Sequence, residues 1–217
     1  MSVRTRVKIC GITRAEDGVA AARAGADAIG LVFWPGTIRC VKFAAARAIV
    51  EALPPFVSVV GLFVDPTADQ VRSALSEVAL DVLQFHGNEP EPFCAGFGRP
   101  YVKAVSVKPG VDLLQYAGSY PTAKAWLFDA FEPGGLPGGT GTTFDWGSVP
   151  QRLARPLILS GGLNARNVGV AIRTLHPWAV DVSSGVEDTG DDGKPLKGQK
   201  SPSKIAAFIR EVCNADG

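Results

Sequence analysis

Residues 7–33, VKICGITRAEDGVAAARAGADAIGLVF, contain a complete strand–helix–strand unit. Val7–Cys10 and Ala28–Phe33 are short, mainly apolar runs without regular polar alternation, a pattern typical of parallel strands buried on both faces. Arg14–Ala24 between them is alanine-rich and amphipathic, and Gly25 follows where a helix would end. The stretch therefore predicts two parallel strands joined by a helix.

The same unit recurs along the rest of the chain. Strand ends, taken at residues 10, 33, 64, 86, 106, 129, 160 and 183, are 20–31 residues apart, which fits one strand, one helix and two short loops. We therefore expect one α/β domain over residues 1–217, a closed (β/α)8 barrel of eight parallel strands. An open doubly wound sheet is the alternative, but it usually has fewer strands and a G-x-G-x-x-G motif after the first, where this chain has Cys10-Gly11-Ile12-Thr13. The eight candidate strands are Val7–Cys10, Ala28–Phe33, Val57–Val64, Val82–Phe85, Tyr101–Val105, Ala125–Phe128, Leu157–Leu159 and Ala179–Val182.

Amphipathic segments between these runs predict the helices. They are Arg14–Ala24, Phe43–Leu53, Thr67–Val78, Pro90–Phe97, Val111–Ala117, Asn164–Leu175 and Ser201–Val212. Two segments break the repeat. The Gly- and Pro-rich segment 130–143 interrupts it without joining two domains, and the charged segment Asp188–Lys204 is expected to be a solvated loop before the last helix.

Composition excludes several classes of protein. The 217 residues are 46% hydrophobic, which excludes disorder of the whole chain. A net charge of +1 does not indicate binding to nucleic acid or to an anionic membrane. No apolar run approaches the roughly 20 residues of a membrane-spanning helix. Four cysteines without a C-x-x-C pair indicate reduced thiols. We expect a cytoplasmic protein, a monomer or homodimer, with no nucleic-acid or membrane partner.

Glycine turns follow the last two strands. Gly161-Gly162 follows the seventh strand and Ser184-Gly185 the eighth. Such turns expose backbone N–H groups, and (β/α)8 barrels often bind phosphate at this place. The alternative is that the glycines merely allow tight turns, but two such turns in these strands favour a phosphorylated small-molecule ligand.

Four side chains lie at or after the carboxyl ends of strands, where (β/α)8 barrels have their active sites. Asp129 follows an apolar run. Partial removal from water favours the protonated form of a carboxyl, which can donate a proton. The alternative is that Asp129 only orders a loop. Cys10 could be a base if a nearby cation such as Arg39 favours its thiolate, or only a small buried residue. His86 is either a substrate contact or a structural histidine. No grouping has metal-ligand spacing, so no metal is expected.

Together these motifs resemble the phosphoribosylanthranilate isomerase family, an enzyme family of tryptophan biosynthesis. The opening heptapeptide and the aspartate followed by G-G-T-G are the most specific matches. The matching segments are Val7-Lys8-Ile9-Cys10-Gly11-Ile12-Thr13, Gly30-Leu31-Val32-Phe33, Val60-Gly61-Leu62-Phe63, Leu83-Gln84-Phe85-His86-Gly87, Leu127-Phe128-Asp129, Gly138-Gly139-Thr140-Gly141, Phe144-Asp145-Trp146, Ser160-Gly161-Gly162-Leu163 and Asp181-Val182-Ser183-Ser184-Gly185-Val186-Glu187.

The resemblance implies an Amadori rearrangement of N-(5-phosphoribosyl)anthranilate to 1-(2-carboxyphenylamino)-1-deoxyribulose 5-phosphate, without a cofactor. It makes Asp129 the general acid that opens the ribose ring and Cys10 the general base at C2′. Arg39 would bind the anthranilate carboxylate, His86 would contact substrate, and the two glycine turns would hold the phosphate.

The chain departs from the family pattern where Ile38 precedes Arg39, a position usually taken by proline.

Three other functions remain open. A non-catalytic barrel that binds a phosphorylated ligand would not need Cys10 and Asp129 together. A second alternative is a histidine-pathway isomerase, but these enzymes have an aspartate at the position of Cys10, which argues against them. A third is a thiol redox protein, which would need a second cysteine near Cys10, and Cys40 is the candidate.

Overall fold

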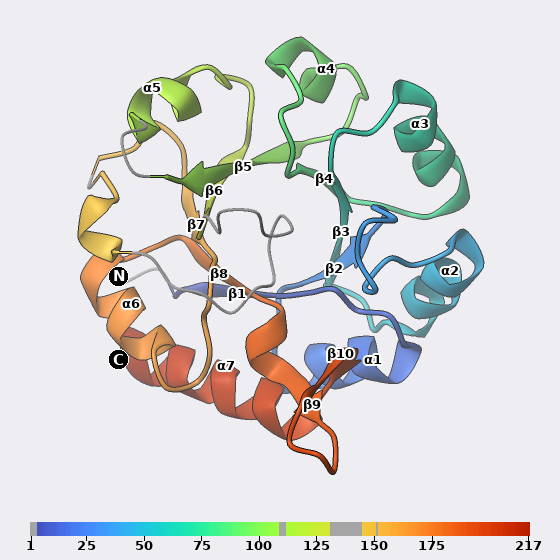
Figure 1. Cartoon of the computed structure of the whole chain (residues 1–217), viewed down its shortest axis with the longest axis vertical. Coiled ribbons are helices and arrows are strands. Elements are labelled where there is room, and N and C mark those ends of the chain that lie inside the picture. Colours follow the sequence, from blue (N-terminus) through green and yellow to red (C-terminus); the bar gives the residue numbers. More distant parts are fainter. Residues whose placement is uncertain (1–3, 109–111, 131–144, 151) are drawn as a thin grey trace.

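The eight expected strands form a closed parallel barrel in the order β1 to β8 (Figure 1). The computed structural model describes residues 4–108, 112–130, 145–150 and 152–217. Each strand pairs with the next, and β8 closes the ring on β1. The (β/α)8 barrel predicted from the sequence is thus confirmed. The strands are β1 (Arg6–Cys10), β2 (Ala28–Val32), β3 (Ser58–Phe63), β4 (Val82–Phe85), β5 (Tyr101–Val107), β6 (Ala125–Ala130), β7 (Leu157–Leu159) and β8 (Ala179–Val182).

Helices surround this ring of strands (Figure 1). They are α1 (Ala15–Ala24), α2 (Phe43–Ala52), α3 (Ala68–Glu77), α4 (Glu91–Ala95), α5 (Leu113–Gly118), α6 (Val168–Leu175) and α7 (Pro202–Asp216), with short 3-10 helices η1 (Trp146–Ser148) and η2 (Ser184–Val186). Among the described residues, no helix is both long and apolar enough to span a membrane. Most bounds agree with the prediction to within a few residues, while Val111, the predicted start of the fifth helix, lies outside the described residues.

Apolar side chains pack in separate clusters because strand residues alternate between the two faces of the barrel wall. The larger cluster lies between the strands and the helices, whereas Val102, Ala104, Ala125 and Leu127 form a separate cluster inside the barrel. Asp129 lies two residues beyond Leu127 on β6 and therefore shares its inward-facing side. The alternation thus turns this carboxyl toward the barrel interior.

The sixth helix starts later than expected. Asn164 was predicted as its first residue, but the helix begins at Val168. The Asn164 side chain instead accepts a hydrogen bond from the N–H of Arg166 and donates one to the carbonyl of Gly162. Asn167 also donates to the Gly162 carbonyl, at 3.0 Å. Both asparagines therefore hold the Gly161-Gly162 turn rather than extend the helix.

The segment between β8 and the last helix was expected to be a solvated loop, but it is a hairpin in which residues 191–197 are exposed and Lys200 is buried. Residues 187–200 form an antiparallel hairpin of β9 (Glu187–Thr189) and β10 (Pro195–Lys200), beside α1 and α7 (Figure 1). The backbone N–H of Lys200 donates to Asp17 on α1 at 2.9 Å. Glu187 and Lys200 are both buried and form an ion pair. One of the charges that suggested a solvated loop, that of Lys200, is therefore buried and paired, whereas Asp191, Asp192, Lys194 and Lys197 are exposed.

Candidate active site

The predicted site residues gather at the carboxyl ends of the barrel strands. Cys10 is the last residue of β1, Asp129 is the penultimate residue of β6, and His86 directly follows β4. The Gly161-Gly162 turn and Ser184-Gly185 follow β7 and β8, which lie between β6 and β1 in the ring. Cys10 and Asp129 thus lie on different sides of one barrel mouth, with the glycine turns on the arc between them.

Asp129 is buried and held by two hydrogen-bond donors. His86 Nε2 lies 3.1 Å from Asp129 Oδ2, and the N–H of Ala130 donates to Oδ1 at 3.0 Å. On the other side of the ring, the amide nitrogen of buried Gln84 lies 3.1 Å from His86 Nδ1. With that amide donating to Nδ1, the ring carries its hydrogen on Nε2 and donates it to the carboxylate. His86, expected to contact substrate, is thus placed directly against the candidate acid.

Cys10 lies among charged groups inside the barrel. Burial raises the pKa of the Cys10 thiol, the ammonium of Lys8 opposes that shift, and Asp181 reinforces it. Lys200 also acts to lower the Cys10 pKa. Of the two roles left open for Arg39, that of the cation beside the thiol is not favoured, because these lysines take that position.

Arg39 is instead bound to Glu187 at the start of the hairpin. Its Nε and Nη2 donate to the two carboxylate oxygens, at 2.6 and 2.9 Å. Gly198 and Lys200 of β10 also contact Glu187, at 2.9 and 3.4 Å. Burial alone would raise the pKa of Glu187, but the hydrogen bonds from Arg39 and the charge of Lys200 outweigh it and lower that pKa. The hairpin therefore orients the Arg39 guanidinium without the proline of the family pattern.

The two glycine turns touch one another and the candidate acid. Gly161 has φ +87°, and a Cβ there would lie 2.5 Å from the Ala130 nitrogen and 3.1 Å from Asp129 Oδ1. A Cβ on Gly185 would lie 1.9 Å from the carbonyl oxygen of Leu163. Among the described residues, the N–H groups of Gly161, Gly162, Ser184 and Gly185 take part in no hydrogen bond. N–H donors left without a partner in this way suit an anion.

Several residues of this region were missed by the sequence reasoning. They are Lys8, Gln84, Asp181, Glu187 and Lys200, all of them buried polar groups. A usable signal existed, since Lys8, Gln84 and Asp181 interrupt otherwise apolar strands and each must find a partner there. The predicted Gly138-Gly139-Thr140-Gly141 motif lies outside the described residues. In the part of the chain that is described, no group of three or more His, Cys, Asp or Glu residues could hold a metal ion.

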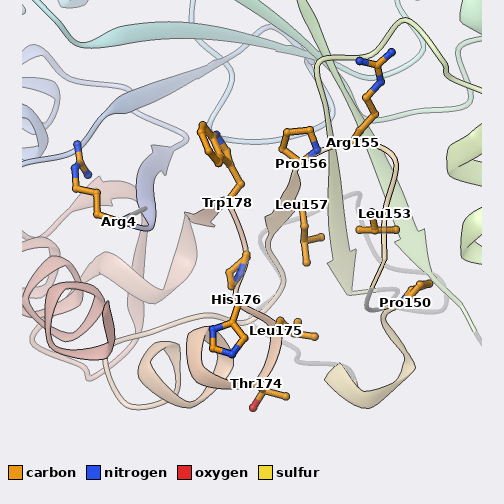
Figure 2. Close-up of a pocket in the computed structure, with 11 residues that line it drawn as sticks. Arg4, Pro150, Leu153, Arg155, Pro156, Leu157, Thr174, Leu175, His176 and Trp178 are labelled. Atoms are coloured by element: carbon orange, nitrogen blue, oxygen red, sulfur yellow. The ribbon is translucent and has the colours of Figure 1, made fainter. Parts of the chain in front are cut away.

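The amino-terminal end of the barrel also has cavities. One of about 620 Å³ is lined by Arg4, Leu157, His176 and Trp178, which lie near the amino-terminal ends of β1, β7 and β8 (Figure 2). Catalytic groups of (β/α)8 barrels lie at the carboxyl ends of the strands. This cavity is therefore separate from the candidate site.

The closed barrel, with an acid, a thiol and two glycine turns at the carboxyl ends of its strands, defines a (β/α)8-barrel enzyme. The family model for N-(5'-phosphoribosyl)anthranilate (PRA) isomerase matches residues 7–211. The chain is 54% identical over 207 residues to the N-(5'-phosphoribosyl)anthranilate isomerase of Nitrosospira multiformis, covering 95% of this chain and 96% of that one. The chain belongs to this family and is an isomerase of tryptophan biosynthesis, as the motifs predicted.

Solved structures agree with this assignment. The phosphoribosyl anthranilate isomerase of Thermotoga maritima superposes with a TM-score of 0.85 at 38% identity, covering 97% of this chain and 99% of that one. A second isomerase structure, with a TM-score of 0.82 at 37% identity and 97% and 99% coverage, is a complex with reduced 1-(o-carboxyphenylamino)-1-deoxyribulose 5-phosphate. Similarity therefore extends along nearly the whole chain.

Proposed function

We propose that the chain converts N-(5-phosphoribosyl)anthranilate to 1-(2-carboxyphenylamino)-1-deoxyribulose 5-phosphate, with Asp129 as general acid and Cys10 as general base. The observation that carries the proposal is the placement of both groups at one barrel mouth, with two donor-rich glycine turns between them. A related isomerase binds a reduced form of this product, which supports the substrate class.

Ring opening is the first step. Asp129 gives its proton to the ribose ring oxygen while the anthranilate nitrogen pushes its electron pair to C1′, so that the C1′–O bond breaks and a protonated Schiff base forms. His86 Nε2 and the Ala130 N–H already donate to the Asp129 oxygens. They therefore hold the carboxylate that proton donation leaves.

Proton removal from C2′ follows. The Cys10 thiolate takes the C2′ proton, the electrons of the C–H bond neutralise the iminium, and the resulting enolamine tautomerises to the ketone. The substrate supplies the electron sink, so these steps need only groups that move protons. Each such group typically contributes about 10²–10⁴-fold in rate.

The remaining predicted residues bind the substrate. Arg39, oriented by Glu187, would hold the anthranilate carboxylate, since a guanidinium matches that planar anion. The phosphate would accept hydrogen bonds from the N–H groups of Gly161, Gly162, Ser184 and Gly185. Anchoring both ends of the substrate fixes the sugar between the acid and the base.

Turnover of freshly generated N-(5-phosphoribosyl)anthranilate tests the proposed reaction. We expect rapid loss of the anthranilate-type fluorescence and formation of the carboxyphenylamino ketose phosphate. A folded chain that leaves this signal unchanged would overturn the proposal and favour the non-catalytic barrel that binds a phosphorylated ligand.

Gly185→Ala should weaken substrate binding. Its Cβ would lie 1.9 Å from the Leu163 carbonyl oxygen, so the two turns must move apart and the phosphate loses aligned donors. Loss of one hydrogen bond to a charged group corresponds to about a tenfold or larger rise in KM. Steady-state kinetics measure this, and competitive inhibition by inorganic phosphate should weaken in parallel. Gly118→Ala, where a Cβ has no neighbour within 4 Å, is the matched control. An unchanged KM in Gly185→Ala would remove this turn from the phosphate site.

We also propose a single domain over residues 1–217 and a cytoplasmic location. The ring of strands spans Arg6 to Val182, and α7 continues to Asp216. All four cysteines are free thiols, which supports a reducing compartment.

We propose further that two copies associate through the amino-terminal ends of their barrels. A T. maritima relative is described as dimeric. Phe56, just before β3 in this chain, is completely exposed with φ +70°, a costly arrangement for an aromatic residue without a partner. An apolar cavity of about 480 Å³ opens at the same barrel end, lined in part by Val60, Val82 and Val102. Phe56 of one copy and the cavity of the other supply complementary surfaces.

Phe56→Asp should dissociate the pair, because a carboxylate cannot be buried without a partner. We expect light scattering to give twice the 22.7 kDa chain mass for the unmodified protein and the single-chain mass for the variant. Leu114→Asp, at another exposed apolar position, should remain paired. A native mass of one chain, or a variant that stays paired, would contradict the proposed interface.

A further inference from the structure

A buried ion pair lies beside Cys10 inside the barrel. Lys8 Nζ is 2.9 Å from both carboxylate oxygens of Asp181, and the two side chains are 7% and 5% exposed. Lys8 on β1 and Asp181 on β8 are register partners, so the closure of the ring brings them together. The mechanism above uses neither residue.

Backbone geometry directs this pair toward the thiol. Lys8 lies two residues before Cys10 on β1 and therefore faces the same side of the barrel wall. Cys10 pairs with Gly30 on β2, and a Cβ on Gly30 would lie 2.7 Å from Cys10 Sγ and 3.1 Å from Lys8 Nζ. The absence of a side chain at Gly30 thus leaves one space that the thiol and the ammonium share.

Stability alone is a poor explanation for such a pair. Buried ion pairs contribute little net stability compared with well-packed apolar residues of similar size. The buried pair of Lys103 and Glu89 in the barrel wall, in contrast, has a structural role. Lys103 bonds Glu89 at 2.8 Å and also donates to the carbonyl of Gly87 at 2.6 Å, so it holds the loop after β4. The Lys8 ammonium contacts Asp181 and shares its space with a thiol.

We propose that Lys8 and Asp181 are positioning residues that set the balance between thiol and thiolate at Cys10. The Lys8 ammonium stabilises the thiolate, and Asp181 holds that ammonium in place and moderates its charge. The inference rests on the proposed role of Cys10 as the base, because a thiolate is the form that accepts the C2′ proton.

The charged groups around Cys10 fix the sign of each expected effect. They are Lys8 on β1, Asp181 on β8 and Lys200 on β10, the last paired with Glu187. Lys8 and Lys200 lower the Cys10 pKa, whereas burial and Asp181 raise it, and the Lys8 charge has a larger effect than that of Asp181. Removing Lys8 alone should therefore raise the Cys10 pKa. Removing Asp181 as well should bring it part of the way back.

The test titrates Cys10 without substrate. In a Cys40→Ser, Cys213→Ser background, which removes both exposed thiols, the rate of iodoacetamide alkylation at Cys10 is followed against pH by peptide mass spectrometry. We expect Lys8→Met to slow alkylation at neutral pH by roughly tenfold or more, one pKa unit being tenfold in thiolate. The double variant Lys8→Met, Asp181→Asn should fall between Lys8→Met and the unmodified protein. Lys103→Met, which removes a buried lysine that pairs with Glu89, should leave the pH dependence of Cys10 alkylation unchanged.

Two outcomes would overturn the inference. One is a Lys8→Met profile that matches the unmodified protein or shifts no more than that of Lys103→Met. The other is a double variant that shifts further than Lys8→Met. Circular dichroism checks that each variant is folded. If alkylation shifts as expected while the pH dependence of kcat does not follow it, the pair still sets the state of the thiol, and it is the role of Cys10 as base that fails.

Discussion

Replacing Asp129 by asparagine should lower kcat by about 10²–10⁴-fold without unfolding the protein. Asparagine keeps the shape of the side chain, and its single carbonyl oxygen can still accept a hydrogen bond from one of the two groups, His86 Nε2 and the Ala130 N–H, that contact Asp129 at 3.1 and 3.0 Å. It has no acidic proton to give to the ribose oxygen, so the furanose ring must open without help. The expected loss therefore lies in kcat, while KM changes little.

Turnover of freshly generated substrate measures the effect, with circular dichroism as the check on folding. Asp112→Asn is the matched control, because Asp112 caps α5 through the N–H groups of Leu114 and Gln115 and asparagine caps equally well. The control should keep its full kcat. Near-normal turnover of Asp129→Asn would remove this carboxyl from the mechanism.

The barrel was predictable because its strands are buried on both faces. Leu157–Leu159, a continuous apolar run that follows Pro156, matches β7 to the residue, and Ala179–Val182, apolar except for Asp181, matches β8 to the residue. The position of the site followed from the same pattern, because residues just past such strands share one end of the barrel.

Pairings between distant residues were not predictable in the same way. His86 and Asp129 are 43 residues apart, and their contact depends on how β4 and β6 are placed around the ring. The charges of Asp188–Lys204 indicated solvent exposure, whereas Lys200 at its β10 end is fully buried against Glu187. A local window shows that a charge is present, but only the closed fold shows which opposite charge it meets.

Replacing Cys10 by serine should also lower kcat by about 10²–10⁴-fold. The hydroxyl fits the space above Gly30, yet it is a much weaker acid than a thiol and supplies almost no oxyanion to act as base. Lys8 and Lys200, which oppose the effect of burial on the Cys10 pKa, cannot make up that difference. Cys213→Ser, at an exposed thiol of α7, should keep its full activity.

Substrate deuterated at C2′ separates the two proposed roles. When Cys10→Ser makes removal of the C2′ proton the slow step, kcat should show a larger deuterium isotope effect than in the unmodified protein. When Asp129→Asn makes ring opening slow, C2′ is not yet reacting and the isotope effect should be close to one. The opposite assignment of isotope effects would exchange the roles of the two residues. Equal effects in both variants would instead place both groups on one proton transfer and would contradict the separate roles assigned from their positions on β1 and β6.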